Sequence, residues 1–343
     1  MTRSTQYRNA ARPEVSILIP LYNSAGTIER AIRSAQRQTL PDVEILVADD
    51  ASTDDGAARV ASLAQQDNRI RLLRLPDNGG KPRAMNIMIS QARGNWLAVL
   101  DADDAFHHER LEILLSGAAA SGTDMAADNL NYVDAGVAAE PGQFGRFVRH
   151  GFDPAAGDRV LGKRDMLRNG DSAADFDYGI LKPVIRRRFV EQHGLAYDES
   201  SRLAEDFAYL LEYFVAGGSM FLCARALYDW TMPFGTLSRR WTSTGAGPWR
   251  YDYRPVIAAN RELIARMAAR GENDVVALLQ RRGHGYQVMV HYLGAQRLAA
   301  SGRYAAAAAC ILRHPDTYRL LARRIAGRVA RALRRPVASH GVC

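Results

Sequence analysis

Apolar runs that alternate with helically spaced segments are the feature that most limits what this chain can fold into. Its first hundred residues contain four short apolar runs: Val15–Ile19 ending at Pro20, Val43–Ala48, Ile70–Leu75 and Trp96–Leu100. The segments between them, 25–38, 54–65 and 82–92, are typical of helices. Because apolar strands separated by helices indicate βαβ units, the sequence predicts an α/β fold with a mostly parallel central sheet flanked by helices.

Polar residues follow three of these four runs. Tyr22 and Asn23 follow the first run, Asp49 and Asp50 end the second, and Asp101–Asp104 follow the fourth. Open parallel sheets bind their ligands outside the carboxyl ends of the strands. We therefore predict a binding site at this edge of the sheet.

The segment Asp101-Ala102-Asp103-Asp104 places three carboxylates within four residues. Such carboxylates repel one another unless a cation or solvent lies between them. Oxygen ligands suit Mg²⁺ or Mn²⁺, and a metal held by one or two carboxylates usually completes its shell with phosphate oxygens. The alternative is a solvated acidic loop or a helix N-terminus, where the helix dipole favours acids. The cluster alone leaves these two interpretations equally open.

Two further segments at this edge have both a functional and a structural interpretation. Acids in Asp49–Asp54 could accept hydrogen bonds from a base or a ribose, or could cap the next helix. The segment Asn78-Gly79-Gly80-Lys81-Pro82-Arg83 places two cations at a helix start, an arrangement that favours anions. It lacks the spacing of a Walker loop, and taken alone it is more typical of a turn.

Taken together, and in this order, four segments resemble the family 2 glycosyltransferases, which have the GT-A fold. The segments are Ile19–Asn23, Val47–Asp54, Asn78–Gly80 with Arg83 and Asn86, and Leu100–Asp104. A fifth, Glu205-Asp206, falls where that family carries its catalytic base, and the resemblance covers residues 12–245. Within the family, the sequence is similar to bacterial exopolysaccharide glucosyltransferases of the succinoglycan type at Ala127–Leu130, Tyr178–Val184 and Ala204–Phe207.

The resemblance implies a site for a nucleotide-sugar and a metal ion. Tyr22 and Asp50 would contact the uracil and ribose, and Arg83 would approach the nucleotide or its diphosphate. Asp103 or Asp104 would hold Mg²⁺ or Mn²⁺. The full set expected to bind the nucleotide-sugar is Pro20, Tyr22, Asn23, Asp50, Lys81, Arg83, Asp101 and Asp103.

The resemblance also implies a catalytic base and a reaction. Asp206 would deprotonate the acceptor hydroxyl, with Glu205 beside it, while the metal and Arg83 would stabilise the leaving diphosphate. One base and no enzyme nucleophile gives single displacement, hence inversion at the anomeric carbon. We expect a metal-dependent inverting glycosyltransferase that moves a sugar, expected to be glucose, from a UDP-sugar to a lipid-linked oligosaccharide in bacterial exopolysaccharide biosynthesis.

Two departures from the family pattern concern the metal and the nucleotide. Many relatives carry a histidine after the last sheet strand as a further metal ligand, but Tyr228–Thr236 contains none. Relatives often show Ala-Arg-Asn after the glycine turn, whereas this chain has Arg83-Ala84-Met85-Asn86, which weakens a role for Asn86. His107 and His108 lie beside the acidic cluster, but adjacent helical histidines point apart, so we expect them to be solvated.

We expect three parts along the chain. A flexible N-terminus (1–12) precedes a catalytic domain (13–250), and a helical C-terminal region (251–343) follows it. The catalytic domain would comprise a nucleotide-sugar half (13–104) and an acceptor half (105–250). In the acceptor half we expect a long connection or lid at 141–170, a helix at 202–216, a strand pair at 220–222 and 226–231, and a mobile loop at 233–250.

The basic residues are unevenly distributed. The formal net charge is +8, and of 45 lysines and arginines only Lys81, Lys163 and Lys182 are lysines, a bias that we attribute to a GC-rich bacterial genome. Residues 313–335 combine eight arginines with an apolar stripe, which predicts an amphipathic helix able to lie on an anionic membrane. A helix packed on the catalytic domain is the alternative. No nucleic-acid motif is present, so no nucleic-acid partner is expected.

Location follows from what the sequence lacks. The three cysteines are widely spaced, residues 1–13 do not form a secretory signal, and no apolar run approaches the roughly 18 residues of a membrane span. We expect a cytoplasmic protein, peripherally associated with the inner membrane, that meets a polyprenyl-diphosphate-linked saccharide acceptor at the cytoplasmic face. The alternative functions are a nucleotidyltransferase, although Leu21–Gly26 lacks its phosphate signature, and a catalytically inactive sugar- or lipid-binding module.

Overall fold

The computed structural model of the chain describes residues 12–134, 146–168, 177–201, 204–232, 253–318 and 322. Two compact units divide the chain: the first takes residues 1–166 and 178–244, and the second takes residues 167–177 and 245–343. Residues 1–11 and the loop predicted at 233–250 lie outside the described residues. The domain boundaries predicted at residues 12 and 250 stay predictions.

The first half of the first unit is a parallel α/β arrangement, as predicted. β1 (Val15–Leu21) lies between β2 (Val43–Asp49) and β4 (Trp96–Val99), and β3 (Ile70–Arg74) lies at the edge beyond β2. Every residue of β2 and β4 is buried, including those that point to opposite faces. Most residues of these strands are apolar because both faces of the sheet are covered.

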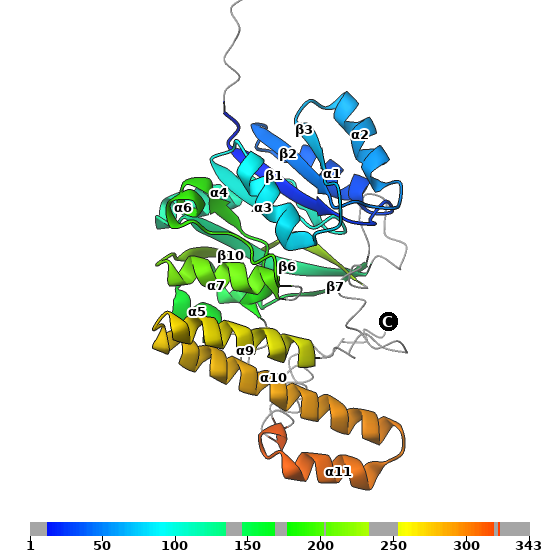
Figure 1. Cartoon of the computed structure of the whole chain (residues 1–343), viewed down its shortest axis with the longest axis vertical. Coiled ribbons are helices and arrows are strands. Elements are labelled where there is room, and N and C mark those ends of the chain that lie inside the picture. Colours follow the sequence, from blue (N-terminus) through cyan, green and yellow to red (C-terminus); the bar gives the residue numbers. More distant parts are fainter. Residues whose placement is uncertain are drawn as a thin grey trace, which may run out of the picture. The chain divides into compact units, whose positions relative to one another are not determined.

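Three helices connect these strands and overlap the predicted segments (Figure 1). They are α1 (Ile28–Gln36), α2 (Gly56–Gln66) and α3 (Lys81–Gln91). α1 buries Ile28, Ala31, Ile32 and Ala35, the residues whose spacing predicted it. The carboxyl ends of β1, β2 and β4 and the start of α3 therefore meet at one edge of the sheet, where the site was predicted.

The sheet continues into a mixed second half, in the order β3-β2-β1-β4-β9-β6-β10-β5, with β7 on β6 and β8 on β10. The added strands are β5 (Ala105–Phe106), β6 (Met125–Asp134), β7 (Arg146–His150), β8 (Arg159–Leu161), β9 (Val184–Arg186) and β10 (Met220–Met232). In the described part, β6 and β10 pair in parallel, and the other pairings of these strands are antiparallel. The helices and 3₁₀ turns of this half are α4 (Arg110–Ser121), η1 (Pro154–Ala156), α5 (Lys163–Arg168), η2 (Tyr178–Ile180), α6 (Arg187–His193) and α7 (Glu205–Val215).

Two predictions in this half are wrong. In its described part, the segment predicted as a connection or lid at 141–170 forms β7, η1, β8 and the helix α5. Its two strands are short and rich in arginine, so they lack apolar periodicity. The strand pair predicted at 220–222 and 226–231 is one strand, β10, whose register shifts between Cys223 and Tyr228. The exposed Arg225 at this irregularity lies within the strand.

The second unit is helical, as predicted for the C-terminal region. α9 (Arg254–Ala269) and α10 (Asn273–Ala300) lie side by side, and α11 (Tyr304–Arg313) folds back along α10 (Figure 1). Within this unit, Arg282 Nη2 of α10 lies 2.6 Å from Asp177 Oδ2. No helix in the described ranges is both long enough and apolar enough to cross a membrane. Apart from Ala322, residues 319–343 lie outside the described part, so the basic tail helix stays a prediction.

Candidate active site

Asp50 holds the glycine turn that leads into α3. Its Oδ1 accepts a hydrogen bond from the Gly79 amide at 2.9 Å, and its Oδ2 accepts one from the Gly80 amide at 2.8 Å. Gly80 has a φ of 87°, which glycine adopts without the steric cost that other residues meet. Asp50 is 3% exposed and shapes this turn, and its predicted contact with uracil or ribose stays a prediction.

The loop after β1 is tied to the loop after β2. Asn23 Oδ1 accepts a hydrogen bond from the Thr53 amide at 2.8 Å, and the Asn23 amide donates to Ser52 Oγ at 3.1 Å. Pro20 and Tyr22 are half-buried at the same end of β1. The structure thus brings the predicted nucleotide-binding residues of these two loops to one edge of the sheet.

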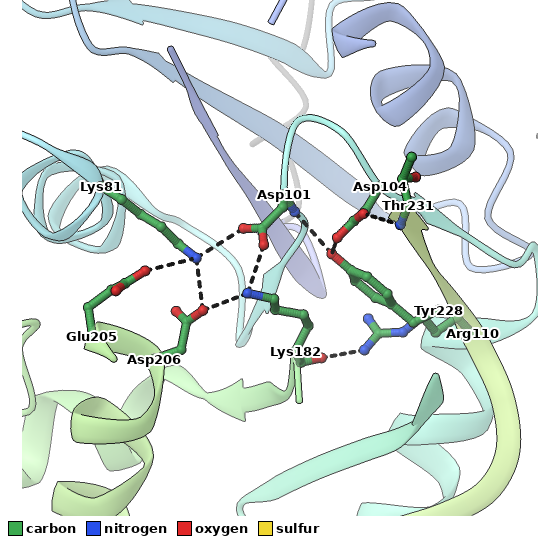
Figure 2. A network of polar contacts seen from close by, with 9 residues as sticks. All are labelled: Lys81, Asp101, Asp104, Arg110, Lys182, Glu205, Asp206, Tyr228 and Thr231. Atoms are coloured by element: carbon green, nitrogen blue, oxygen red, sulfur yellow. Dashed lines mark hydrogen bonds and ion pairs between the residues drawn. The ribbon is translucent and has the colours of Figure 1, made fainter. Parts of the chain in front are cut away.

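Two lysines and three carboxylates form what we call the lysine–acid cluster: Lys81, Lys182, Asp101, Glu205 and Asp206. Lys81 Nζ lies 3.1 Å from Asp101 Oδ1, 2.9 Å from Asp206 Oδ2 and 3.6 Å from Glu205 Oε1. Lys182 Nζ lies 2.7 Å from Asp101 Oδ2 and 2.5 Å from Asp206 Oδ2. Figure 2 shows both ammonium groups between the acidic strand end and the first turn of α7. The cluster joins the predicted donor side, at Asp101, to the predicted base.

Opposite charges keep the carboxylates of this cluster ionised. Burial by itself raises the pKa of Asp101 and of Asp206, but the nearby Lys182 and Lys81 outweigh it, so both pKa values are lowered. Burial likewise lowers the pKa of Lys81, but Asp101 and Asp206 outweigh it and the pKa rises well above its ordinary value. At neutral pH the cluster therefore holds two ammonium groups against charged carboxylates.

The two oxygens of Asp206, the predicted base, have different surroundings. It lies in the first turn of α7, where the helix dipole favours a negative charge. Its Oδ2 contacts the two lysines, whereas its buried Oδ1 has no hydrogen-bond partner among the described residues. A substrate hydroxyl that donated to Oδ1 would satisfy this oxygen. Glu205 precedes it and contributes the longer contact to Lys81.

Asp103 and Asp104 lie in different surroundings. Asp104 Oδ2 accepts a hydrogen bond from the Tyr228 hydroxyl at 2.7 Å, and its Oδ1 accepts one from the Thr231 amide at 2.9 Å (Figure 2). Asp104 thus anchors the end of β10. Burial and then the charge of Asp101 raise the pKa of Asp103, and burial followed by the charges of Asp103 and Asp101 raises that of Asp104 well above the ordinary value.

The carboxylates at this strand end fit a hard divalent cation. The charge of Asp103 is disfavoured by burial and by Asp101, a state that a bound cation would relieve. No group of three or more histidine, cysteine, aspartate or glutamate side chains around a possible metal position occurs in the described ranges. One or two carboxylates suffice where phosphate oxygens complete the shell of Mg²⁺. Both oxygens of Asp104 already accept hydrogen bonds, and the metal-ligand predictions for Asp103 and Asp104 stay predictions.

Arg83 and Asn86, the other residues of α3 in the family motif, contact protein groups. Arg83 Nη1 lies 2.7 Å from Asp77 Oδ2, and its side chain packs over Gly79, where a Cβ would lie 2.3 Å from Arg83 Cδ. Asn86 Nδ2 donates to the Tyr197 carbonyl and its Oδ1 accepts from the Tyr197 amide. Asn86 thus secures the chain ahead of α7, and the nucleotide-binding role of Arg83 stays a prediction.

Sequence reasoning missed Lys182, Tyr228 and Arg110 as parts of this site. Arg110 is fully buried, lies 2.7 Å from Asp128 and donates to the carbonyl of Lys182 (Figure 2). The signal for Lys182 was available, because it is one of only three lysines in the chain. Nothing in the sequence pointed to Tyr228 and Arg110, because their roles depend on contacts with other elements of the fold.

The helical geometry predicted for the two histidines is wrong for His107, whose side chain is 40% exposed. Its Nε2 lies 2.8 Å from Asp229 Oδ1, and this bond, more than burial, raises the pKa of His107. His108 is exposed, as predicted. His107 directly follows β5, a strand that pairs with β10. The helical geometry assumed for His107 therefore does not apply.

Comparisons with known proteins identify relatives of this chain. The family model described as glycosyl transferase family 2 matches residues 16–155. The succinoglycan biosynthesis protein ExoO of Rhizobium meliloti is 33% identical over 331 residues, which cover 92% of this chain and 88% of the relative. The succinoglycan biosynthesis protein ExoU of the same organism is 38% identical over 200 residues, covering 58% of this chain and 56% of the relative.

Solved structures share the fold at low sequence identity. S. aureus TarS 1-349 in complex with UDP-GlcNAc has a TM-score of 0.60 at 17% identity and covers 86% of this chain and 79% of its own. The mannosyltransferase PcManGT from Pyrobaculum calidifontis, in complex with GDP-Man and Mn²⁺, has a TM-score of 0.53 at 18% identity, covering 95% of this chain and 82% of its own. These likenesses establish the GT-A type of fold. Because similarity to ExoO at 33% identity runs through nearly the whole chain, and the family model spans the strand ends that form the site, the chain belongs to the family 2 glycosyltransferases.

Proposed function

We propose that this chain is an inverting glycosyltransferase that moves glucose from a UDP-sugar to a lipid-linked oligosaccharide in bacterial exopolysaccharide biosynthesis. Asp206 is the observation that carries the proposal. One of its oxygens faces the two lysines that also contact Asp101, and the other has no hydrogen-bond partner in the described part. In this proposal the acceptor hydroxyl would donate to the second oxygen, while the first faces the predicted donor side. The similarity to two succinoglycan biosynthesis proteins supports the pathway class.

The proposed reaction is a single displacement. The acceptor hydroxyl oxygen attacks the anomeric carbon while its proton passes to Asp206. The bond from this carbon to the diphosphate oxygen breaks, and UDP leaves with the bonding electrons. Because attack and departure occur on opposite faces of the sugar, the configuration inverts. Lys81 supplies positive charge beside Asp101, where the negative charge of the leaving group develops.

A divalent cation completes the proposal. Asp103, with Asp104 as the alternative ligand, would hold Mg²⁺ or Mn²⁺, which when bound screens the charge of the leaving diphosphate. The Mn²⁺ in the PcManGT complex supports this choice of ion. UDP titrated calorimetrically should bind much more tightly with Mn²⁺ than with EDTA, and equal affinities would exclude the metal role.

A donor screen tests the function itself. The chain should release UDP from UDP-glucose in the presence of Mn²⁺ or Mg²⁺, faster than from UDP-galactose, UDP-GlcNAc or GDP-mannose. A lipid extract that contains polyprenyl-diphosphate-linked saccharides should increase the rate, and NMR of the product should show inversion. UDP binding without any release would instead indicate an inactive binding module. Pyrophosphate release from a nucleoside triphosphate and a sugar phosphate would indicate a nucleotidyltransferase.

We further propose peripheral attachment to the cytoplasmic face of the inner membrane, where such an acceptor is anchored. Residues 313–335 pair an apolar stripe with eight arginines, and anionic lipids attract each basic residue near their surface by about 1 kcal/mol. The full chain should sediment with anionic liposomes at low salt, and much less with neutral ones. A chain that ends at His314 should stay in solution. Equal sedimentation of the two chains would assign membrane contact to another part of the protein.

A further inference from the structure

We propose that Lys182, together with Lys81, binds the diphosphate of the donor, and that Asp206 competes with this diphosphate for both ammonium groups. The inference rests on the proposed function, because it assumes a nucleoside-diphosphate donor. It adds a second lysine to the predicted donor site. It also links that site to the predicted base, because both lysines contact Asp206.

The backbone of Lys182 is held by Arg110. The Lys182 carbonyl accepts a hydrogen bond from Arg110 Nη2 (Figure 2). Arg110 is fully buried, and its Nη2 lies 2.7 Å from Asp128 Oδ1. Pro183, which follows, has a fixed φ and further restricts the chain. The ammonium group of Lys182 therefore extends from a fixed backbone. A charged group that binds a ligand needs such a fixed position.

One lysine lies near each oxygen of Asp101. Lys81 lies against its Oδ1 at 3.1 Å and Lys182 against its Oδ2 at 2.7 Å. A bare carboxylate at this strand end would repel a diphosphate, whereas one neutralised on both oxygens would not. An ammonium group has three donors, and among the described residues Lys182 Nζ contacts two carboxylates, which leaves one donor for a phosphate oxygen.

The choice of lysine also indicates a specific role. The chain uses arginine almost everywhere, yet two of its three lysines converge on the same pair of carboxylates. A lysine ammonium is a compact point charge that can turn its donors toward a new partner, unlike the planar fork of arginine. This property suits a cation that alternates between Asp206 and a phosphate.

The alternative is that Lys182 only neutralises two buried acids, and binding measurements separate the two roles. UDP and uridine are titrated calorimetrically at a fixed Mn²⁺ concentration into the wild-type chain, Lys182→Met and Lys163→Met. Lys182→Met should weaken UDP binding by roughly 10- to 100-fold, the usual range for a charge-assisted contact, and leave uridine binding unchanged. Lys163→Met, which changes the one lysine outside the cluster, should bind both as the wild type does.

Asp206→Asn provides the opposite test. If Asp206 competes for the ammonium groups, its neutralisation should strengthen UDP binding by roughly 3- to 10-fold. That gain should shrink in the double variant with Lys182→Met. Circular dichroism and thermal melting check each variant, and Lys182→Gln replaces Lys182→Met if the latter does not fold.

The outcomes distinguish this inference from the proposed function. A wild-type chain that bound neither UDP nor uridine would contradict both. Wild-type binding of UDP, with equal affinity in Lys182→Met, would overturn the role of Lys182 alone. A parallel loss of UDP and uridine binding would show that Lys182 acts through the structure of the site. No gain in Asp206→Asn would overturn the competition.

Discussion

Two loops and two buried ion pairs of the first unit hold their polar groups in different ways. Asp50 and Asp54, in the parallel first half, accept hydrogen bonds from backbone amides and so shape loops. In the second half, buried side chains of opposite charge pair between different elements, as in Arg110 of α4 with Asp128 of β6 and in Lys182 with Asp206 of α7. A loop shaped by backbone bonds loses one bond at a time, whereas a buried ion pair leaves an uncompensated charge when one partner is removed.

The largest effect expected from this contrast is on the stability of the acceptor half. Arg110→Met leaves Asp128, which is 1% exposed, without its charge partner, so the free energy of unfolding should fall by about 3–5 kcal/mol. Urea unfolding measures this loss. The control is Arg33→Met in the exposed pair with Glu29, which should change stability by less than about 0.5 kcal/mol. Equal effects of the two variants would break the comparison.

A smaller effect is expected from the donor loops. Asp50→Asn cannot accept both glycine amides, so stability should fall by about 1–3 kcal/mol and UDP affinity should fall with it. Asp54→Asn, which alters a carboxylate bonded to the Ala25 and Gly56 amides, is the matched control and should leave UDP affinity unchanged. Unfolding and UDP titration of both variants sharpen the comparison, because Asp50 is among the residues predicted to bind the nucleotide and Asp54 is not.

The smallest effect concerns pH and His107. Asp229 raises the pKa of His107 in the folded chain above its ordinary value of 6.5. Protonated His107 therefore adds stability that is fully present below about pH 6.5 and is lost as the pH rises through the higher folded value. His107→Gln should remove this pH dependence of the unfolding midpoint, whereas the exposed neighbour His108→Gln should keep it. The same pH dependence in His107→Gln would mean that the Asp229 pair contributes nothing.

The contrast between the halves also explains what the sequence could predict. β1, β2 and β4 are almost entirely buried, so their mainly apolar sequences and the polar residues at their ends were visible in the sequence. β6 has no such run, because it contains Asp128, Asn129 and Asn131. These polar residues can be buried because they bond to partners that are distant in the sequence. The same reason hid Tyr228, whose hydroxyl binds a residue 124 positions away. The strand ends that match family motifs were found, and side chains whose partners lie on other elements were missed.

The central claim is that Asp206 is the base of a glycosyl transfer whose donor binds beside it. The most direct measurement is UDP-sugar turnover by Asp206→Asn, with UDP affinity measured on the same preparation. We expect transfer to fall by at least roughly 100-fold, the usual cost of losing a general base, while UDP still binds at least as tightly as to the wild-type chain. Near-normal turnover in this variant would contradict the claim, because another residue would then take the proton.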